Sequence, residues 1–398
     1  MDRVIVFLKG MFPADCHDRI FTVGGSVREM LLDKESRDLD LAAALTPDEF
    51  MAAGFRLVEG KSTAPIWFRY DGSFGKIEAT PLAHISELAT DLAGRDFTVN
   101  AIAMGLEGEI IDPLGGRRDL EQRLLRACSP DSFLADPLRI FRALRFEAEG
   151  WRMSPETETL LRAQEWEPRL TPIPVERFTR EMLKALEAPE PGRFFRRMAE
   201  FRVGNAWLPE LFRMPAIPAG PLIHHPEGDL LTHSLQVLER VAGRTAAPLA
   251  RFCALFHDLG KLATDPADFP KHHGHDEAGF NLARGFCDRM RLPAEYRTAL
   301  AWTSRLHATL NRWTELRGST RVTLAEQALK AGISAILPLV CRADKGVDGE
   351  ITGWENAVRI ARMSATELGI DTSRLETMAP GTRPDLILQK RVEMLRKE

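Results

Sequence analysis

The pattern of hydrophobic and polar positions divides the chain into an N-terminal part with predicted strands and a longer helical part. Within residues 1–125, short β-like runs at 20–23 and 39–42 flank a helical run at 26–32. Alternating apolar positions favour a strand, whereas a spacing of three or four favours a helix. The remainder is helical except for a proline-rich stretch at 209–226, which predicts a linker. The chain is therefore predicted to be α+β at its start and all-α afterwards.

The length of 398 residues exceeds what one hydrophobic core normally holds, so several domains are expected. Candidate catalytic aspartates begin at Asp38, whereas most of the ten histidines fall between His224 and His307. Two chemistries on separate domains explain this distribution most simply. The expected domains comprise residues 1–125, 126–215 and 216–350, followed by a helical tail at 351–398.

Composition narrows the class of protein. A hydrophobic content of 44% and a charged content of 28% are ordinary for a globular chain, and no apolar run approaches the roughly 20 residues of a membrane span. The five cysteines show no CxxC spacing, and the start of the chain lacks a small-residue cleavage site. These features predict a reduced, cytoplasmic protein without a membrane partner. The net charge of −4 neither indicates nor excludes nucleic acid.

A pair of acidic residues gives the first candidate site. Asp38 and Asp40 stand at i and i+2 of a predicted strand, so both carboxylates point to one face. Two adjacent carboxylates repel each other unless a cation neutralises them, and oxygen ligands suit Mg²⁺. Most isolated DxD pairs are solvated acids, so the assignment depends on what accompanies the pair.

A glycine turn accompanies it. Gly24, Gly25 and Ser26 stand between the first strand and the following helix, where exposed backbone N–H groups can hold phosphate. Arg28, one turn into that helix, can reach the same triphosphate. A phosphate cradle followed by a metal pair predicts phosphoryl transfer, in which catalysis is mostly positioning and charge neutralisation.

Residues 24–32 and 37–42 resemble the signature of the class II tRNA nucleotidyltransferase and bacterial poly(A) polymerase family. Stretches at 95–101, 136–146 and 175–177 match the same family in the same order. The resemblance spans roughly residues 18–215. It implies a polymerase-β-like nucleotidyltransferase head and an all-α neck that together extend the tRNA 3′ end without a template, from CTP and ATP.

The resemblance also implies roles for individual residues. Asp38 and Asp40 would hold two Mg²⁺ ions that activate the RNA 3′-hydroxyl and help pyrophosphate leave, with Glu78 as a third acid. Arg95, Asp96 and Asn100 would shape the ribose pocket. The implied nucleotide-binding residues are Gly24, Gly25, Ser26, Arg28, Arg95, Asp96, Asn100, Asp136, Arg139, Arg142 and Arg145.

Asp136 and Arg139 match the base-reading motif of the family. A carboxylate accepts from the exocyclic amino group of C or A, and a guanidinium donates to a neighbouring ring nitrogen or carbonyl. On a helix, positions i and i+3 share a face. Asp136 followed by Pro137 is equally a good N-cap and N1 pair, and both roles can coexist. Glu176 and Arg177 match a motif that supports a helix.

The chain also departs from the family. Gly94 replaces an arginine of the ribose motif, and Ala135 replaces a glutamate before Asp136. Full CCA-adding members carry a basic flexible loop after the third acid, but segment 79–92 is short and has no lysine or arginine. This favours an enzyme that adds only CC and leaves the terminal A to a separate A-adding enzyme. A head that has drifted, or a poly(A) polymerase, is the alternative.

A second constellation resembles the HD phosphohydrolase superfamily. His233, the His257–Asp258 dyad and Asp344 form its pattern, and a mixed His/carboxylate set suits Ni²⁺, Mn²⁺, Co²⁺ or Zn²⁺. The resemblance adds His273 and His275 to the same pocket and gives Lys261 a phosphate contact. His224, His225, His272 and His307 are interpreted as ordinary polar or surface residues.

The resemblance implies an all-α HD domain that acts on 2′,3′-cyclic or terminal phosphates of RNA. An alternative from another class is an HD phosphohydrolase whose head only binds RNA and transfers no nucleotide. Asp38 and Asp40 argue against that alternative, whereas Gly94 and Ala135 favour it.

Overall fold

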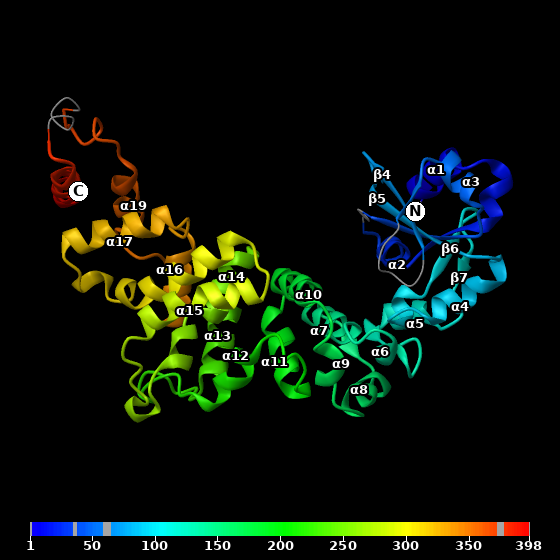
Figure 1. The fold of residues 1–398 in the computed structure, drawn as a ribbon, viewed down its shortest axis with the longest axis horizontal. Helices are drawn as coiled ribbons and strands as arrows, with labels where there is room; N and C mark the ends of the chain where they lie inside the picture. Colours follow the sequence, from blue (N-terminus) through cyan, green and yellow to red (C-terminus); the bar gives the residue numbers. More distant parts are fainter. Residues whose placement is uncertain (1, 35–37, 59–64, 372–377, 398) are drawn as a thin grey trace. The chain divides into compact units, whose positions relative to one another are not determined.

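The computed structural model describes residues 2–34, 38–58, 65–371 and 378–397. The chain forms two compact units, Met1–Glu165 and Trp166–Glu398. In Figure 1 the first unit runs from blue to teal and the second from green to red. The finer division into four domains at residues 125, 215 and 350 stays a prediction. Arg37, part of the first motif, lies outside the described residues.

The first unit is built on a seven-stranded sheet in the order β3-β4-β5-β2-β1-β6-β7. Neighbouring strands are antiparallel except β2 and β5, which are parallel. The predicted strands at 20–23 and 39–42 are confirmed as β1 and β2. The strands are β1 (Ile20–Val23), β2 (Leu39–Ala43), β3 (Arg56–Val58), β4 (Ile66–Asp71), β5 (Gly75–Pro81), β6 (Ala103–Gly105) and β7 (Ile110–Ile111).

The helices of this unit surround the sheet and continue beyond it (Figure 1). They are α1 (Asp2–Met11), α2 (Gly25–Leu31), α3 (Pro47–Ala52), α4 (Leu88–Ala93), α5 (Gly116–Glu121), α6 (Ser132–Ala135), α7 (Arg139–Ala148) and α8 (Pro155–Arg162). A short parallel pair joins β8 (Leu124–Leu125) to β9 (Arg152–Met153), and β9 interrupts the stretch from residue 126 that was expected to be helical.

The two faces of the sheet have different partners. One face packs its apolar side chains, including Leu39 and Leu41 of β2, against α1 and α3. The other face packs Ala42 of β2 against Leu88 and Leu92 of α4. Because successive side chains of a strand point to opposite faces, Asp40 shares the second face with Ala42. The candidate carboxylates therefore lie on the face opposite α1 and α3.

The second unit is helical. Its main core includes Val237, Cys253, Leu306, Val340 and Trp354, all nearly inaccessible to solvent. The helices are α9 (Glu167–Leu170), α10 (Val175–Glu187), α11 (Pro191–Phe201), α12 (Pro209–Arg213), α13 (Leu230–Ala242), α14 (Pro248–Phe256), α15 (His275–Arg289), α16 (Ala294–Leu310), α17 (Gly318–Lys330), α18 (Ile336–Asp344), α19 (Trp354–Arg362) and α21 (Arg383–Lys397).

The stretch 209–226 is not a simple linker, and this prediction was wrong for its first part. Pro209 is the first residue of α12, where a proline costs no hydrogen bond because the first N–H groups of a helix lack a partner within it. Leu211 and Met214 are fully buried, so this part belongs to the packed unit.

Two further observations concern the whole chain. All five cysteines are free thiols. Within the described ranges, none of the helices combines the length and the apolar character that crossing a bilayer requires.

Candidate active sites in the two units

The first unit contains a cavity of about 400 Å³ beside the carboxyl-bearing face of the sheet. It collects residues from the glycine turn, from β2 and β5, and from the motifs at 95–101 and 136–146. The motif at 175–177 belongs to the second unit and does not line it. The lining residues that were predicted from the sequence are Gly24, Gly25, Arg28, Asp40, Glu78, Arg95, Asp96, Asn100, Asp136, Arg139, Arg142 and Arg145. Two predicted residues of this unit do not line the cavity: Ser26, which was expected to bind the nucleotide, and Asp38, which was expected to bind Mg²⁺.

The acids of this cavity come from neighbouring strands. Asp40 of β2 stands directly beside Glu78 of β5 in the parallel register, so their side chains share a face. Asp38 is exposed just before β2 begins. Burial raises the pKa of Asp40; Arg95 opposes this rise, whereas Glu78 and Asp38 add to it. An acid that is destabilised by burial and by other acids is one that a divalent cation would stabilise.

The glycine turn brings backbone close to these acids. Gly24 has φ +71°, a conformation that residues with a side chain rarely adopt, and a Cβ there would lie 2.7 Å from Nη1 of Arg95 and 3.3 Å from Oδ2 of Asp40. The Ser26 hydroxyl donates to the carbonyl of Val23 at 3.0 Å and accepts from the backbone N–H of Asp40 at 3.0 Å. The Ser26 side chain therefore holds Asp40 in place, and only its backbone N–H is available for phosphate.

A chain of polar contacts connects the ribose motif to the arginines. Asp96, which is 5% exposed, accepts from the side chain of Asn100 at 3.0 Å and pairs with Arg142 at 2.8 Å. Asn100 in turn accepts a hydrogen bond from Arg28. The guanidinium of Arg28 also lies over the ring of Phe146. These contacts hold two cations at the cavity wall in fixed positions.

Asp136 and Arg139 both line the cavity, but not as one face of a helix. Asp136 is extended (φ −147°, ψ 100°) and follows α6, whereas Arg139 begins α7. The Asp136 carboxylate accepts from the backbone N–H of Leu138 at 3.1 Å, so it caps the turn that leads into α7. The expected helical i, i+3 pairing was therefore wrong, because the helix starts three residues later.

The Arg139 guanidinium bridges three segments. It donates to the carbonyl of Gly94 at 2.6 Å, to that of Arg95 at 3.1 Å and to the Ser132 hydroxyl at 3.0 Å. Arg139 thus fastens α7 to the ribose motif at the position where Gly94 replaces the usual arginine. The neighbouring Arg145 stacks on the ring of Phe146 and pairs with Glu149.

The second unit brings the four residues of the predicted HD pattern together. Nε2 of His233 on α13 lies 3.1 Å from Oδ1 of Asp344, the last residue of α18, and 3.6 Å from Oδ2 of Asp258. Nε2 of His257 lies 3.2 Å from the same Asp258 oxygen and 3.8 Å from Asp344. His233, His257 and Asp258 are at most 2% exposed. Residues that are distant in the chain thus form one buried cluster.

Two further histidines approach from the other side of Asp258. Nε2 of His275, at the start of α15, lies 3.6 Å from Oδ1 of Asp258, and Nε2 of His307 on α16 lies 3.4 Å from it. His307 was interpreted from the sequence as an ordinary polar residue, and the structure places it in the cluster. A lone histidine inside a helix gives no sequence signal for this, because only the packing of α16 reveals what it faces.

The positions of His273 and Lys261 differ from those predicted from the sequence, whereas His272 agrees with its interpretation. His273 is exposed and does not line the cavity beside the cluster, because the chain turns at Gly274 (φ +73°) so that only His275 enters it. His272 is a satisfied buried residue, bonded to Thr264 and to the carbonyl of Pro218, as interpreted. Lys261, expected at phosphate, pairs with Asp258 at 2.6 Å.

The ring orientation of the clustered histidines is defined by their other nitrogen. Nδ1 of His257 lies 2.9 Å from the carbonyl of Ala254, Nδ1 of His275 lies 2.7 Å from that of His272, and Nδ1 of His307 lies 2.8 Å from that of Ser304. A carbonyl can only accept, so each Nδ1 carries a proton, and Nε2 is the nitrogen that faces the carboxylates and that a metal would take as its ligand. Nε2 of His275 also lies 2.9 Å from Oδ1 of Asp276.

The cluster has the chemistry of a metal site. Among the described residues, Nε2 of His233, Nε2 of His257 and Oδ1 of Asp258 are buried without a hydrogen-bond partner. Burial lowers the pKa of His257, but the carboxylates of Asp258 and Asp344 outweigh burial and raise it to about 10. Ligand atoms of His233, His257 and Asp258 lie within 4.8 Å of one another, as do those of Asp258, His275 and His307. Nitrogen and oxygen donors at such spacing suit a divalent transition metal.

The same unit contains supporting polar groups that sequence reasoning missed. Asn311, which follows α16, donates to Oδ2 of Asp344 at 2.7 Å and leaves Oδ1 to face the histidines. Glu227 accepts from Nδ1 of His233 at 2.7 Å. A cavity of about 510 Å³ opens beside the cluster and is lined by His224 and His225 as well. Neither Asn311 nor Glu227 belongs to the HD pattern, so only the fold connects them to it.

Comparisons with known proteins agree with this division of sites. A model described as the poly A polymerase head domain matches residues 63–126, and one described as the probable RNA and SrmB-binding site of polymerase A matches 152–214. A model described as the HD domain matches residues 230–345.

Curated relatives match most of the chain. The multifunctional CCA protein of Methylococcus capsulatus is 37% identical over 355 residues, which cover 82% of this chain and 81% of the relative. The chain belongs to the multifunctional CCA protein family. The multifunctional CCA protein of Legionella pneumophila strain Paris is 35% identical over 328 residues, or 78% of this chain and 79% of the relative. The family consists of tRNA nucleotidyltransferases, and this member carries an HD domain.

Solved structures of CCA-adding enzymes have the same fold. The Thermotoga maritima enzyme, solved in a complex with tRNA, matches with a TM-score of 0.69 at 21% identity and covers 100% of this chain and 91% of its own. The Bacillus stearothermophilus enzyme in complex with CTP matches with a TM-score of 0.63 at 23% identity. This match covers 94% of this chain and 88% of that enzyme. The predicted fold, a nucleotidyltransferase head followed by helical parts that include an HD domain, is confirmed.

Proposed function

We propose that this member of the multifunctional CCA family adds cytidines from CTP to the 3′ end of tRNA in the cytoplasm. The observation that carries the proposal is that Asp40 and Glu78, the glycine turn, the ribose motif and Asp136 line one cavity. Such a cavity offers a cation site, a phosphate cradle and a base-facing carboxylate to a single nucleotide. The names of the relatives, multifunctional CCA proteins, support the same reaction.

In the proposed reaction, the tRNA 3′-hydroxyl loses its proton to solvent as its oxygen forms a bond to the α-phosphorus of CTP, and the bond from that phosphorus to the β-phosphate oxygen breaks to release pyrophosphate. Mg²⁺ bound by Asp38 and Asp40 would neutralise charge on the attacking and leaving oxygens. Backbone N–H groups at the start of α2 and the guanidinium of Arg28 receive the phosphates. Asp96 and Asn100 border the ribose.

The base is read on the other side of the cavity. The Asp136 carboxylate, already held by the turn before α7, accepts from the exocyclic amino group of cytosine. Arg139, Arg142 and Arg145 lie along the same wall. Arg139 can contact the base only if it loses a hydrogen bond to the carbonyl of Gly94 or Arg95. Its main role is therefore to hold the ribose motif in position.

The connection between β5 and α4 supports addition of CC only. Strand β5 ends at Pro81, a 3-10 turn occupies Ile85–Glu87, and α4 begins at Leu88. Leu88 and Leu92 are buried against the sheet. Residues 83–87, between β5 and α4, are exposed but form a short turn, so the segment has no length left for a basic loop that could reorganise the pocket for ATP after two cytidines.

The HD cluster supports a second activity, hydrolysis of phosphate esters at RNA ends. The Nε2 atoms of His233, His257, His275 and His307 face two carboxylates beside a cavity large enough for a terminal nucleotide. A bound divalent transition metal would polarise the phosphate and lower the pKa of a coordinated water. Substrates of this class are 2′,3′-cyclic phosphates and 3′-phosphates, which must be removed before a 3′-hydroxyl can accept cytidine.

The transferase proposal is tested with tRNA transcripts that lack CCA, labelled CTP, ATP or both, and Mg²⁺. Two cytidines and no adenosine are expected, and the Asp38→Ala/Asp40→Ala variant should add nothing. A complete CCA end would overturn the CC restriction and leave the family activity intact. Long adenosine tails on any RNA would instead favour a poly(A) polymerase, and no incorporation would leave the HD domain as the active part.

The hydrolase proposal is tested on the same protein with 2′,3′-cyclic nucleotides and RNA ending in 3′-phosphate. Activity should depend on added Ni²⁺, Mn²⁺ or Co²⁺ and should be lost in His233→Ala and Asp258→Ala. The transferase variant Asp38→Ala/Asp40→Ala should keep it. Equal hydrolysis by the His233→Ala variant would contradict the proposal.

A further inference from the structure

His233 differs from the other histidines of the HD cluster in what holds its ring. His257, His275 and His307 each donate Nδ1–H to a carbonyl three residues earlier in the chain. His233 lies in the first turn of α13, whose N-cap is Asp229, and its Nδ1 donates to the side chain of Glu227 instead. Of these four histidines, His233 is therefore the one whose Nδ1 is held by a side chain, which can be substituted.

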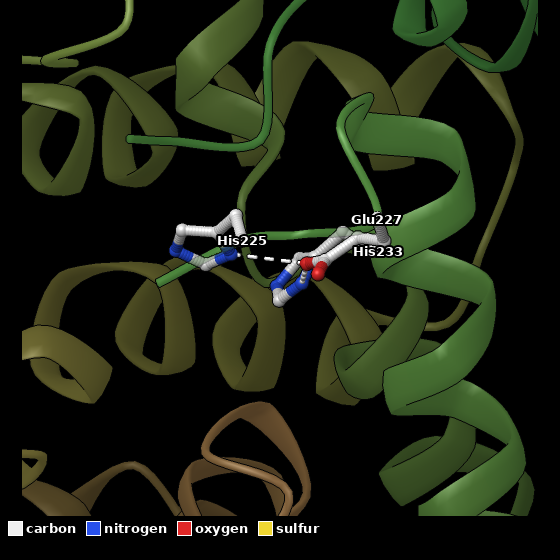
Figure 2. Close-up of side chains that lie close together, drawn as sticks. All are labelled: His225, Glu227 and His233. Atoms are coloured by element: carbon white, nitrogen blue, oxygen red, sulfur yellow. Dashed lines mark hydrogen bonds and ion pairs between the residues drawn. The ribbon is translucent and has the colours of Figure 1, made fainter. Parts of the chain in front are cut away.

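Glu227 is well placed for this task. Its side chain is 9% exposed, and its Oε1 atom lies 2.7 Å from Nδ1 of His233 and 3.0 Å from Nδ1 of His225. In Figure 2, dashed lines connect the Glu227 carboxylate to both rings. The two rings meet edge to face with centroids 4.9 Å apart. The His225 ring packs against Gly220, where a Cβ would come within 2.4 Å of it.

We propose that Glu227 is a positioning residue of the HD centre, which fixes the Nδ1–H tautomer of His233 and aims its Nε2 lone pair at the metal. The inference rests on the proposed metal-dependent function of this cluster. A carboxylate behind a histidine ligand restricts the ring and raises the basicity of the nitrogen that binds the metal. The loss of such a partner typically weakens metal binding by 10–100-fold.

The geometry favours positioning over direct coordination by Glu227. His225, Glu227 and His233 are close enough to share an ion, but both contacts to Oε1 have hydrogen-bond lengths. Nε2 of His233 already faces Asp344 and Asp258. An ion between Glu227 and Nδ1 would require both nitrogens of one imidazole to bind metals, which demands a deprotonated ring. A hydrogen bond needs no such step.

The test measures Co²⁺ binding to the full chain by visible absorption, with a competing chelator to obtain Kd. All proteins carry Asp40→Ala so that the head does not contribute. Glu227→Gln keeps the shape of the side chain, but its amide can donate to Nδ1 and so place the proton on Nε2. We expect a Kd raised about 10–100-fold, with unchanged stoichiometry and an unchanged spectrum at saturation. Glu227→Asp should recover part of the affinity.

Glu239→Gln is the matched control, because it removes a carboxylate of the same kind on α13 that pairs with Arg196 at the surface. It should bind Co²⁺ like the parent. The inference is overturned if Glu227→Gln binds Co²⁺ as tightly as the parent, or if it loses one of two bound ions, since Glu227 would then be a ligand. If the parent itself binds no Co²⁺, the proposed metal centre is refuted. That result differs from both outcomes for Glu227→Gln, since each of them requires a parent that binds the ion.

Discussion

Nε2 of His233 lies 3.1 Å from Oδ1 of Asp344, although the two residues belong to helices far apart in the chain. Asn311 occupies the other oxygen of Asp344 at 2.7 Å, so the carboxylate cannot turn away from the histidine. The contact connects α13 with the end of α18. Whatever binds between these residues therefore also connects two helices of the second unit.

Metal binding should accordingly stabilise this unit. A ligand that binds only the folded state adds about 2.7 kcal/mol when its concentration is 100 times its Kd. We expect the thermal transition of the second unit to rise on addition of Mn²⁺ or Ni²⁺ and to fall with a chelator. Asp344→Ala should abolish the shift, and an equal shift in that variant, measured by calorimetry, would show that the ion binds elsewhere.

The head should depend unequally on its two strand carboxylates. Asp40 stands nearest the glycine turn, whereas Glu78 is partly engaged by Lys76. We expect Asp40→Asn to lower kcat for CTP incorporation by roughly 1000-fold, equivalent to ~4 kcal/mol, and Glu78→Gln to lower it by about 10-fold. Binding of tRNA, measured by filter retention, should be unchanged in both variants. Equal losses of kcat in the two variants would mean that Asp40 and Glu78 contribute equally to the reaction.

The sequence predicted the elements of the head more completely than the contacts of its site. The short β-like runs at 20–23 and 39–42 identified β1 and β2, and the ordered motifs identified most of the residues of the cavity. The partners of Arg139 could not be foreseen, because backbone carbonyls carry no sequence signal. Glu227 and His307 were missed for a related reason, since only the packing of the second unit brings them to the HD residues.

Acid should destabilise the first unit through Glu49. Hydrogen bonds from Arg19 and from the backbone of Thr46 lower the pKa of Glu49 from 4.5 to about 2. A carboxyl group with a lowered folded-state pKa contributes stability above its unfolded value, and this contribution is lost as pH falls from 4.5 to 2. At a partly exposed site the contribution is below about 1 kcal/mol.

The comparison of wild type with Glu49→Gln checks this. Above pH 5 the variant should unfold at a lower temperature, and near pH 2 the two melting temperatures should converge. A constant difference across that range would assign the effect to the neutral capping interaction with Thr46 instead. Far-UV circular dichroism of the full chain follows the transition.

Gly24 should tolerate no side chain. An alanine there would be strained by about 1–3 kcal/mol, because φ +71° with ψ −136° is a backbone conformation that residues with a side chain rarely adopt, and its Cβ would also collide with Arg95 at the cavity wall. We expect Gly24→Ala to lower kcat/KM for CTP by at least about 10-fold. Gly115→Ala is the matched control, because Gly115 has φ +75° with open space around it. If both variants lose activity equally, backbone strain alone explains the effect.

The ion pair between Asp96 and Arg142 should determine how well CTP is held. Asp96 is buried and also anchors Asn100, so Asp96→Asn removes the charge that keeps Arg142 against the cavity wall. A hydrogen bond to a charged group contributes about 1.5–3 kcal/mol, which corresponds to a roughly 10–100-fold loss of kcat/KM. Most of the loss should appear in KM, because the pair orders the nucleotide pocket and does not touch the metal pair.

Arg142→Lys extends this test. A lysine keeps the positive charge but presents a single ammonium in place of the planar guanidinium, so the contact with Asp96 should be only partly restored. We expect a smaller increase in KM than in Asp96→Asn. Arg162→Gln, which removes an exposed pairing with Glu158, should leave both constants unchanged. If Asp96→Asn lowers kcat while KM stays constant, the ion pair acts on the transition state and its role in holding the nucleotide is refuted.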